Sequence, residues 1–238
     1  RDLHSFPTRR SSNLSLEGFD QLSTMYVNYN YPYYPRHMEQ MSGFKKDNDY
    51  VECKVKVPEV VPEKFSKITE MVRRRYHLRV HKFTRHELIE EGYGRKVFDL
   101  LNTTYKDLYG FSQLSDRQIN KLVNDYIKLA DLNLVTAIMD EDKMVGFGIT
   151  FPSFSRALQK TRDGRLFPFG WWHLLKILKW HKTPVVDLLL IGVLPEYRAK
   201  GANALIFDDL IRQFQAYGFE WAETGPQMES NEGVLSQW

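Results

Sequence analysis

Apolar residues follow two periods along this chain, and each period predicts a different element. Alternation of apolar and charged residues predicts half-buried strands, whereas recurrence every three or four residues predicts helices with one buried face. The predicted strands cover residues 50–57, 78–83, 134–139, 144–151, 185–193 and 219–224. The predicted helices cover residues 37–41, 63–76, 85–109 with a break at the glycines near 92–94, 115–130, 171–180 and 200–217, and a last one begins at Glu229 or Ser230.

One predicted strand differs from the others because it is apolar almost throughout. Residues 185–193 are interrupted only by Asp187 and Gly192. Such a run is typical of a strand that is covered on both faces. From residue 78 the order of elements is strand, two helices, hairpin, an insert over residues 154–183, strand, helix, strand and helix.

The segment with the clearest chemical meaning joins the apolar strand to the helix that follows it, over residues 193–204. The first N–H groups of a helix have no partner within the helix, and the helix dipole adds partial positive charge there. Gly201 and Ala202 allow a ligand to approach the backbone closely, and Arg198 and Lys200 add whole charges. This combination predicts a diphosphate site. Neither the P-loop pattern nor the Gly-x-Gly-x-x-Gly dinucleotide pattern is present.

The same segment resembles the acetyl-CoA signature of the GNAT (N-acetyltransferase) superfamily, Gln/Arg-x-x-Gly-x-Gly/Ala. Arg198, Gly201 and Asn203 stand at its three defined positions, and residues 193–197 match the usual Val-x-Pro-x-Tyr/Phe lead-in. Asn203 departs from the family pattern, which has Gly or Ala there. The resemblance implies an α/β (α+β) fold with a mixed, mostly antiparallel sheet, helices on both faces and a central splayed strand pair.

The resemblance also implies a cofactor site and an activity. Acetyl-CoA would donate an acetyl group directly to an amine, on a small molecule or a peptide. The residues expected to bind it are Ile191, Gly192, Val193, Arg198, Ala199, Lys200, Gly201, Ala202, Asn203, Ala204 and Asn231.

Two carboxylates are candidates for the base that takes the proton of the amine. Glu223 follows the CoA helix, and its alternative interpretation is an exposed strand carboxylate. Asp187 interrupts an apolar strand, and its alternative is a structural hydrogen bond, because a buried carboxylate needs a partner. Trp238 stands where the family commonly has the Tyr that protonates the thiolate, and an indole cannot do this. A catalytically silent CoA-binding or structural lobe is therefore the alternative function.

Residues 26–57 resemble the end of a GNAT lobe. We therefore expect residues 15–62 to be the C-terminal remnant and linker of an upstream lobe, and residues 63–238 to be a second lobe that is truncated at its end. Residues 1–14 resemble translated sequencing-adapter read-through, and we expect them to be a non-native tail.

Composition gives no support for a nucleic-acid-binding, disulfide-bonded or membrane-spanning protein. The 33 basic and 30 acidic residues give a net charge of +3, which is no argument for nucleic acid. The single cysteine, Cys53, fits a reducing cytoplasm. No apolar run is long enough to span a bilayer, although the basic, Trp-bearing helix over 171–180 suggests either a cap on the acceptor site, an ordinary packed element or a membrane-surface module. We expect no metal site, since His77, His81 and His86 cannot share one face and His173 lies on a helix.

Overall fold

The core of the protein is a six-stranded sheet. The computed structural model describes residues 14–43, 45–127 and 130–235. The strand order is β2-β7-β6-β5-β4-β3, and only β6 and β7 run parallel. The strands are β2 (Lys54–Lys56), β3 (Arg79–His81), β4 (Val135–Asp140), β5 (Lys143–Pro152), β6 (Val185–Val193) and β7 (Trp221–Thr224); β1 (Tyr50–Val51) pairs separately with β8 (Gln227–Met228). The mixed, mostly antiparallel sheet predicted from the sequence is confirmed.

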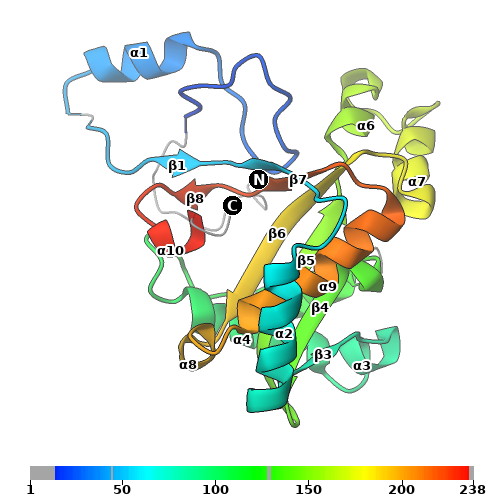
Figure 1. The fold of residues 1–238 in the computed structure, drawn as a ribbon. Coiled ribbons are helices and arrows are strands. Elements are labelled where there is room, and N and C mark those ends of the chain that lie inside the picture. The colour runs from blue at the N-terminus through cyan, green and yellow to red at the C-terminus, as the bar shows by residue number, and fades with distance from the viewer. Residues whose placement is uncertain (1–13, 44, 128–129, 236–238) are drawn as a thin grey trace.

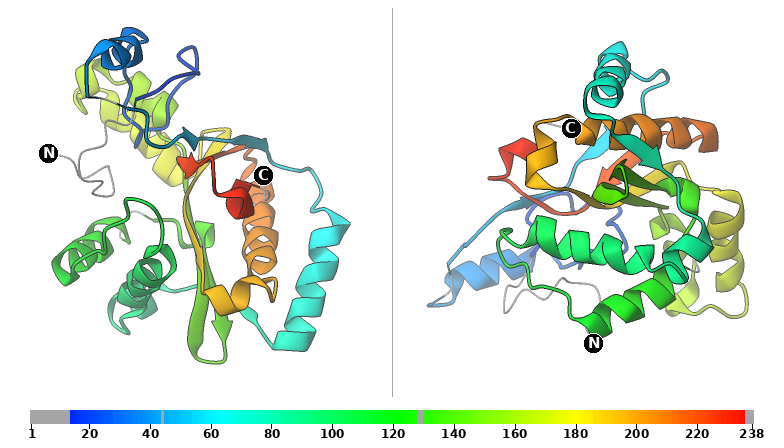
Figure 2. Two further views of the ribbon diagram at one scale, coloured as in Figure 1. Left: turned by 90° about the vertical axis from the view of Figure 1, so that its left-hand side faces the viewer. Right: turned by 90° about the horizontal axis from the view of Figure 1, so that it is seen from below.

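Helices cover both faces of this sheet (Figure 2, left). One face carries α9 (Ala202–Tyr217), with α2 (Glu63–Tyr76) packed against it, and the other carries α4 (Tyr93–Tyr105) with α3 (Arg85–Ile89) and α5 (Asp116–Tyr126). Helix α9 lies very close to the sheet at Gly148, where a Cβ atom would be 2.7 Å from Ile206 Cγ2. Leu205, Ile206 and Leu210 of α9 are completely buried there, so the apolar face of this helix forms much of the core.

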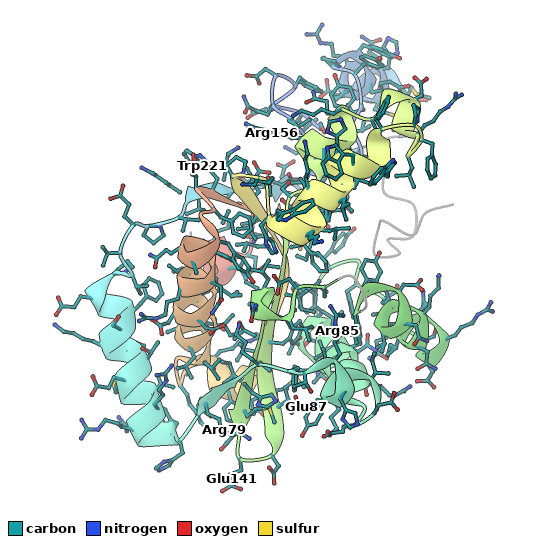
Figure 3. All side chains as sticks on the ribbon, turned by 90° about the vertical axis from the view of Figure 1, so that its right-hand side faces the viewer. Arg79, Arg85, Glu87, Glu141, Arg156 and Trp221 are labelled. Carbon is teal, nitrogen blue, oxygen red and sulfur yellow. The ribbon has the colours of Figure 1, made fainter. Side chains whose placement is uncertain are left out.

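The remaining elements lie around the edges of the sheet. Figure 1 shows α1 (Tyr33–Gln40) and the rest of the N-terminal segment at the same end as α6 (Ser155–Gln159) and α7 (Gly170–Trp180). Figure 3 shows Arg156 of α6 at that end and Glu141, at the tip of the β4–β5 hairpin, at the opposite end. Helix α8 (Pro195–Arg198) follows β6, α10 (Glu232–Leu235) follows β8, and 3-10 turns cover Leu132–Leu134 and Arg162–Gly164.

The strand predicted over residues 50–57 is divided in the structure. Tyr50–Val51 pairs with β8, whereas Lys54–Lys56 pairs with β7. Both partners come from the far end of the chain, so a local alternation of apolar and charged residues could not show where one pairing stops and the next begins. The segment over residues 15–62 thus supplies an edge strand to the sheet of the segment that follows it.

The two parallel strands separate halfway along β6. They pair only from Val185 with Trp221 to Leu188 with Thr224. At the same level the register between β5 and β6 shifts, because Ile149 faces Leu190 whereas Thr150 faces Leu188. The extra residue is a β-bulge, which bends a strand and ends regular pairing. Beyond it, β7 and β8 lead away from the second half of β6 (Figure 1), so the predicted splayed pair is present.

Candidate functional site

A large cleft opens where β6 and β7 separate. Its volume is about 2630 Å³, which exceeds the ~300–1,000 Å³ of compact ligand pockets, so it is larger than a single small-molecule pocket. The walls come from the N-terminal segment, α4, α5, α6, α7, β5, β6, the start of α9 and the segment from β7 to α10. Among the predicted site residues, it is lined by Asp187, Ile191, Gly192, Val193, Arg198, Asn203, Glu223 and Asn231.

The second half of β6 presents its backbone to this cleft. Leu194 N–H donates to Val145 O on β5, and backbone groups of alternate residues point to opposite sides of a strand. The N–H and C=O groups of Ile191 and Val193 therefore point away from β5, toward the side that β7 has left. A ligand with amide groups could pair with these positions as an added strand would.

Two side chains of the protein already contact these backbone groups. The Tyr105 hydroxyl donates to Ile191 O at 3.0 Å and accepts from Ile191 N–H at 3.4 Å. Arg198 Nε donates to Val193 O at 3.0 Å, and its Nη2 donates to Thr104 O at 3.4 Å. The Arg198 charge is therefore held at the edge of the cleft. Burial raises the pKa of the Tyr105 phenol to about 12, so this hydroxyl remains protonated.

The turn after β6 was predicted as a diphosphate site, and only some of its residues reach the cleft. Gly201 precedes α9 with a φ of +82°, a left-handed conformation that favours glycine. A Cβ atom at Gly201 would also lie 3.0 Å from Val72 Cγ2 of α2. Of the α9 residues, Ala202 is completely buried, whereas Asn203 is half-buried and lines the cleft. The first turn of α9 thus meets the cleft at Asn203.

Lys200 lies outside the set of residues that line the cleft. Its Nζ is 4.1 Å from the centre of the Tyr197 ring and 5.7 Å from that of Tyr76 on α2. Ala199, Gly201, Ala202 and Ala204 are also absent from the cleft wall. The structure therefore brings Arg198 and Asn203 to the cleft, and it directs the Lys200 ammonium to two aromatic faces, a cation–π arrangement.

The two candidate bases stand side by side. Asp187 of β6 and Glu223 of β7 are register partners. Asp187 is only 2% exposed, and burial raises the pKa of its carboxyl to about 7. The nearby charges of Glu223 and Glu52 act in the same direction, and a hydrogen bond from Ser153 opposes them. Glu223 is half-buried and forms an ion pair of 2.7 Å with Lys54.

The N-terminal segment adds groups that sequence reasoning missed. Glu52 lies just before β2 and is an exposed residue. Partial burial of its carboxyl and the nearby charge of Glu223 raise the pKa of this carboxyl to about 6. Burial and the negative charges of Asp187, Glu52 and Glu223 raise the pKa of Tyr26 far above its usual value. No motif marks Tyr26 or Glu52, because only the strand pairing places them here.

The other end of the cleft is formed by β8 and α10. Asn231 precedes α10 and accepts from Val234 N–H and Leu235 N–H through its backbone oxygen. Its side chain belongs to a half-buried residue in the cleft wall. Trp238 lies outside the described residues, so the expectation for the thiolate acid stays a prediction.

Helix α7 contributes both to the cleft and to the surface. Leu174 and Leu178 line the cleft. Trp171, Trp172 and Trp180 are exposed by 43%, 40% and 45%, and Lys176 and Lys179 lie 5.2 Å from the Trp172 and Trp180 ring centres. No helix in the described ranges is long and apolar enough to cross a bilayer. Within the same ranges, no three or more His, Cys, Asp or Glu side chains are grouped so that they could hold a metal ion.

Comparisons with known proteins add a fold-level likeness. No protein-family model matches the chain. The chain is 23% identical over 235 residues to Protein YghO of Escherichia coli (strain K12), and the match covers 97% of this chain but 59% of that protein. The chain thus spans about three fifths of the length of this relative.

Two solved structures are also similar, although with TM-scores below 0.5. A GCN5-related N-acetyltransferase from Sphaerobacter thermophilus has a TM-score of 0.49 and 13% identity, over 83% of this chain and 48% of that one. The PaiA N-acetyltransferase from Thermoplasma acidophilum, solved in complex with coenzyme A, has a TM-score of 0.40 and 12% identity. The match covers 67% of this chain and 86% of that one. At this level of similarity, function has to be argued from the residues of the cleft itself.

Proposed function

We propose that the chain carries an acyltransferase site that moves an acetyl group from acetyl-CoA to an amine. The observation that supports this most is the parting of β6 and β7. It leaves the backbone of Ile191 and Val193 facing a cleft, with Arg198 and Asn203 at one end of that strand and Asp187 at the other. An extended, amide-bearing donor with a phosphate group suits the first part, and a basic acceptor suits the second.

The reaction needs a neutral amine and a base. The amine nitrogen attacks the thioester carbonyl, so that an N–C bond forms, the C–S bond breaks and the sulfur leaves as a thiolate. The proton that the amine loses goes to a carboxylate and returns, in the overall balance, to the thiolate. Asp187 suits the role of base, because a pKa of about 7 matches the operating pH of a general base.

Glu223 suits a supporting role better than that of the base. Its carboxylate is already paired with the Lys54 ammonium at 2.7 Å. The ion pair occupies the Glu223 carboxylate, which leaves it less free than Asp187 to contact an amine. We therefore assign Asp187 as the base and Glu223 as the residue that keeps Lys54 and the local negative charge in place.

The donor site is tested by thermal stabilisation with CoA. A ligand at a hundredfold excess over its Kd should stabilise the fold by ~2.7 kcal/mol. Arg198→Glu places a negative charge at the cleft edge and should abolish the shift. Arg117→Glu is the matched control, because Arg117 is exposed on α5 and does not line the cleft. A CoA shift that survives Arg198→Glu would refute the donor site.

A silent CoA-binding lobe is the second candidate, and one observation favours it. The Tyr105 hydroxyl occupies both backbone groups of Ile191, so an incoming donor would have to displace it. The two candidates differ in one measurement. An acceptor screen with acetyl-CoA that releases free thiol supports the transferase, whereas CoA binding without any thiol release supports the silent lobe.

A further inference from the structure

Four carboxylate and cationic groups gather on one face of the sheet beyond the donor cleft. Register pairing sets Asp187 beside Glu223 and Glu223 beside Lys54, and paired residues share a face of a sheet. Glu52 precedes Lys54 by two residues. Its charge acts on Asp187, and the Glu223 charge acts on it. Lys54 neutralises Glu223, whereas neither Asp187 nor Glu52 has a cationic partner among the described residues.

The N-terminal segment closes this face with polar side chains. Thr24 is 4% exposed, and Tyr26 lies close enough to Asp187, Glu52 and Glu223 for their charges to act on its phenol. Ser155, at the start of α6, is 8% exposed. We call the space between these residues the polar chamber. It is the part of the cleft lined by Thr24, Tyr26, Glu52, Ser155, Asp187 and Glu223.

The chamber collects polar atoms that the protein does not satisfy. Among the described residues, five buried side-chain atoms lack a hydrogen-bond partner, and four of them line this chamber: Thr24 Oγ1, Tyr26 OH, Ser155 Oγ and Asp187 Oδ1. The fifth, His181 Nε2, is 2.9 Å from Asp131 Oδ2 and thus has an ionic neighbour. Buried polar groups are normally hydrogen-bonded. The Thr24 and Tyr26 hydroxyls lie close enough to interact with each other. Asp187 Oδ1 and Ser155 Oγ are therefore the atoms that most need a polar ligand to complete their hydrogen bonding.

The chemistry of these atoms defines the ligand. A primary ammonium has three N–H donors and no acceptor, and the orphan atoms are a carboxylate oxygen and three hydroxyls, all able to accept. A metal ion is a poorer match, since no metal-binding group of three such side chains exists in the described ranges. Asp187 and Glu52 are two carboxyl groups without a cationic partner among the described residues, so the charges in this place leave room for a ligand with more than one ammonium.

We propose that the polar chamber binds the acceptor of the transferase and that this acceptor is a diamine. One ammonium lies among Asp187, Thr24, Tyr26 and Ser155, and the other lies at Glu52. The ammonium at Asp187 first passes one proton through that carboxylate to solvent, and the carboxylate then takes the second proton as the neutral amine attacks. The acceptor role rests on the proposed transferase function, whereas diamine binding stands apart from it. The N-terminal segment is then part of the acceptor site, through Thr24, Tyr26 and Glu52.

Calorimetric titration without CoA tests this directly. The probes are 1,4-diaminobutane and n-pentylamine, which have nearly the same length and shape but carry two charges and one. We expect the diamine to bind at least tenfold more tightly. Glu52→Gln should remove this preference and leave n-pentylamine binding unchanged, whereas Asp187→Asn should weaken both amines. Glu59→Gln, an exposed carboxyl outside the cleft wall, should behave like the unaltered protein.

Several outcomes would overturn the inference. Equal affinity for the two amines, no binding of either at 10 mM, or a diamine preference that survives Glu52→Gln would each do so. A parallel CoA titration separates the two proposals. CoA binding without diamine binding refutes the chamber and leaves the donor site standing, whereas diamine binding without CoA binding refutes the transferase and leaves the chamber standing.

Discussion

Replacing Asp187 with Asn should change the pH dependence of stability. Asp187 is 2% exposed, and burial raises the pKa of its carboxyl from 3.8 to about 7. The folded protein therefore binds this proton more tightly than the unfolded chain. The resulting stability is complete below about pH 4 and is lost as the pH rises to about 7. A difference of about 3 in pKa corresponds to ~4 kcal/mol, and Asn, which does not ionise, loses none of it.

The assay is urea unfolding between pH 4.5 and pH 8 for the unaltered protein and the Asp187→Asn variant. Titrating groups that do not interact with Asp187 cancel in the difference between the two free energies of unfolding, so this difference reports Asp187 together with its neighbours Glu52 and Glu223. That difference should shift in favour of the Asn variant by ~3–4 kcal/mol across the range. Asp142→Asn, in the exposed β4–β5 turn, is the matched control and should run parallel to the unaltered protein.

Parallel curves for the unaltered protein and Asp187→Asn would refute the reasoning, because they would mean that Asp187 ionises as freely in the folded state as in the unfolded one. The expected result also has a functional counterpart. If Asp187 lowers stability at neutral pH but serves the reaction, the Asp187→Asn variant should be more stable than the unaltered protein and should lose acyl transfer.

Three further predictions concern the walls of the cleft. Tyr105→Phe frees the Ile191 backbone and should tighten CoA binding by ~2- to 10-fold in calorimetry, the worth of about one hydrogen bond; an unchanged Kd would mean that the donor does not use Ile191. Gly192→Ala should destabilise the fold by ~1–3 kcal/mol in urea, because its Cβ would lie 2.6 Å from a Phe147 ring carbon, whereas Gly233→Ala, with its nearest atom at 3.9 Å, should be neutral; equal effects would contradict this packing. Tyr197→Phe breaks a 2.7 Å hydrogen bond to Asp140 and should cost ~1–3 kcal/mol by the same assay, and no loss would show that the bond contributes nothing.

Periodicity and continuous apolar runs predicted the elements whose burial is recorded along the chain itself. The helix predicted over 63–76 and the strand predicted over 185–193 have these bounds in the structure. In α2, Val72 is completely buried and the Arg residues of the last turn are exposed. In β6, most side chains are buried or half-buried. Burial of this kind repeats along the chain itself, so the sequence alone records it.

Periodicity could not predict elements whose partners are distant or whose length is short. Helix α8 covers only Pro195–Arg198, within a segment predicted as a turn, and α6 covers Ser155–Gln159 inside the segment treated as an insert. Four or five residues contain too little of a helical period to be recognised. The break between β1 and β2 depends on β8 and β7, which follow about 170 residues later.

The candidate site shows the same division. The motif from Val193 to Ala204 indicated the donor end, because a phosphate site needs local features: a strand, a turn, a glycine and a helix start. The motif also predicted Lys200 as a phosphate ligand, and in the structure its ammonium lies over the rings of Tyr197 and Tyr76. Tyr76 lies on α2, and no local pattern could reveal that contact.

The proposed acceptor end has no motif for a physical reason. Its groups come from β6, from β7 and from a segment that the sequence assigned to a different lobe, and they meet only because β2 pairs with β7. Lys54 on β2 also neutralises Glu223, so this edge strand both completes the sheet and sets the charge of the chamber. A change in the N-terminal segment could therefore alter the acceptor without touching the donor motif. The two halves of the proposed site depend on different parts of the chain, and in this proposal the choice of amine lies with the part that carries no signature.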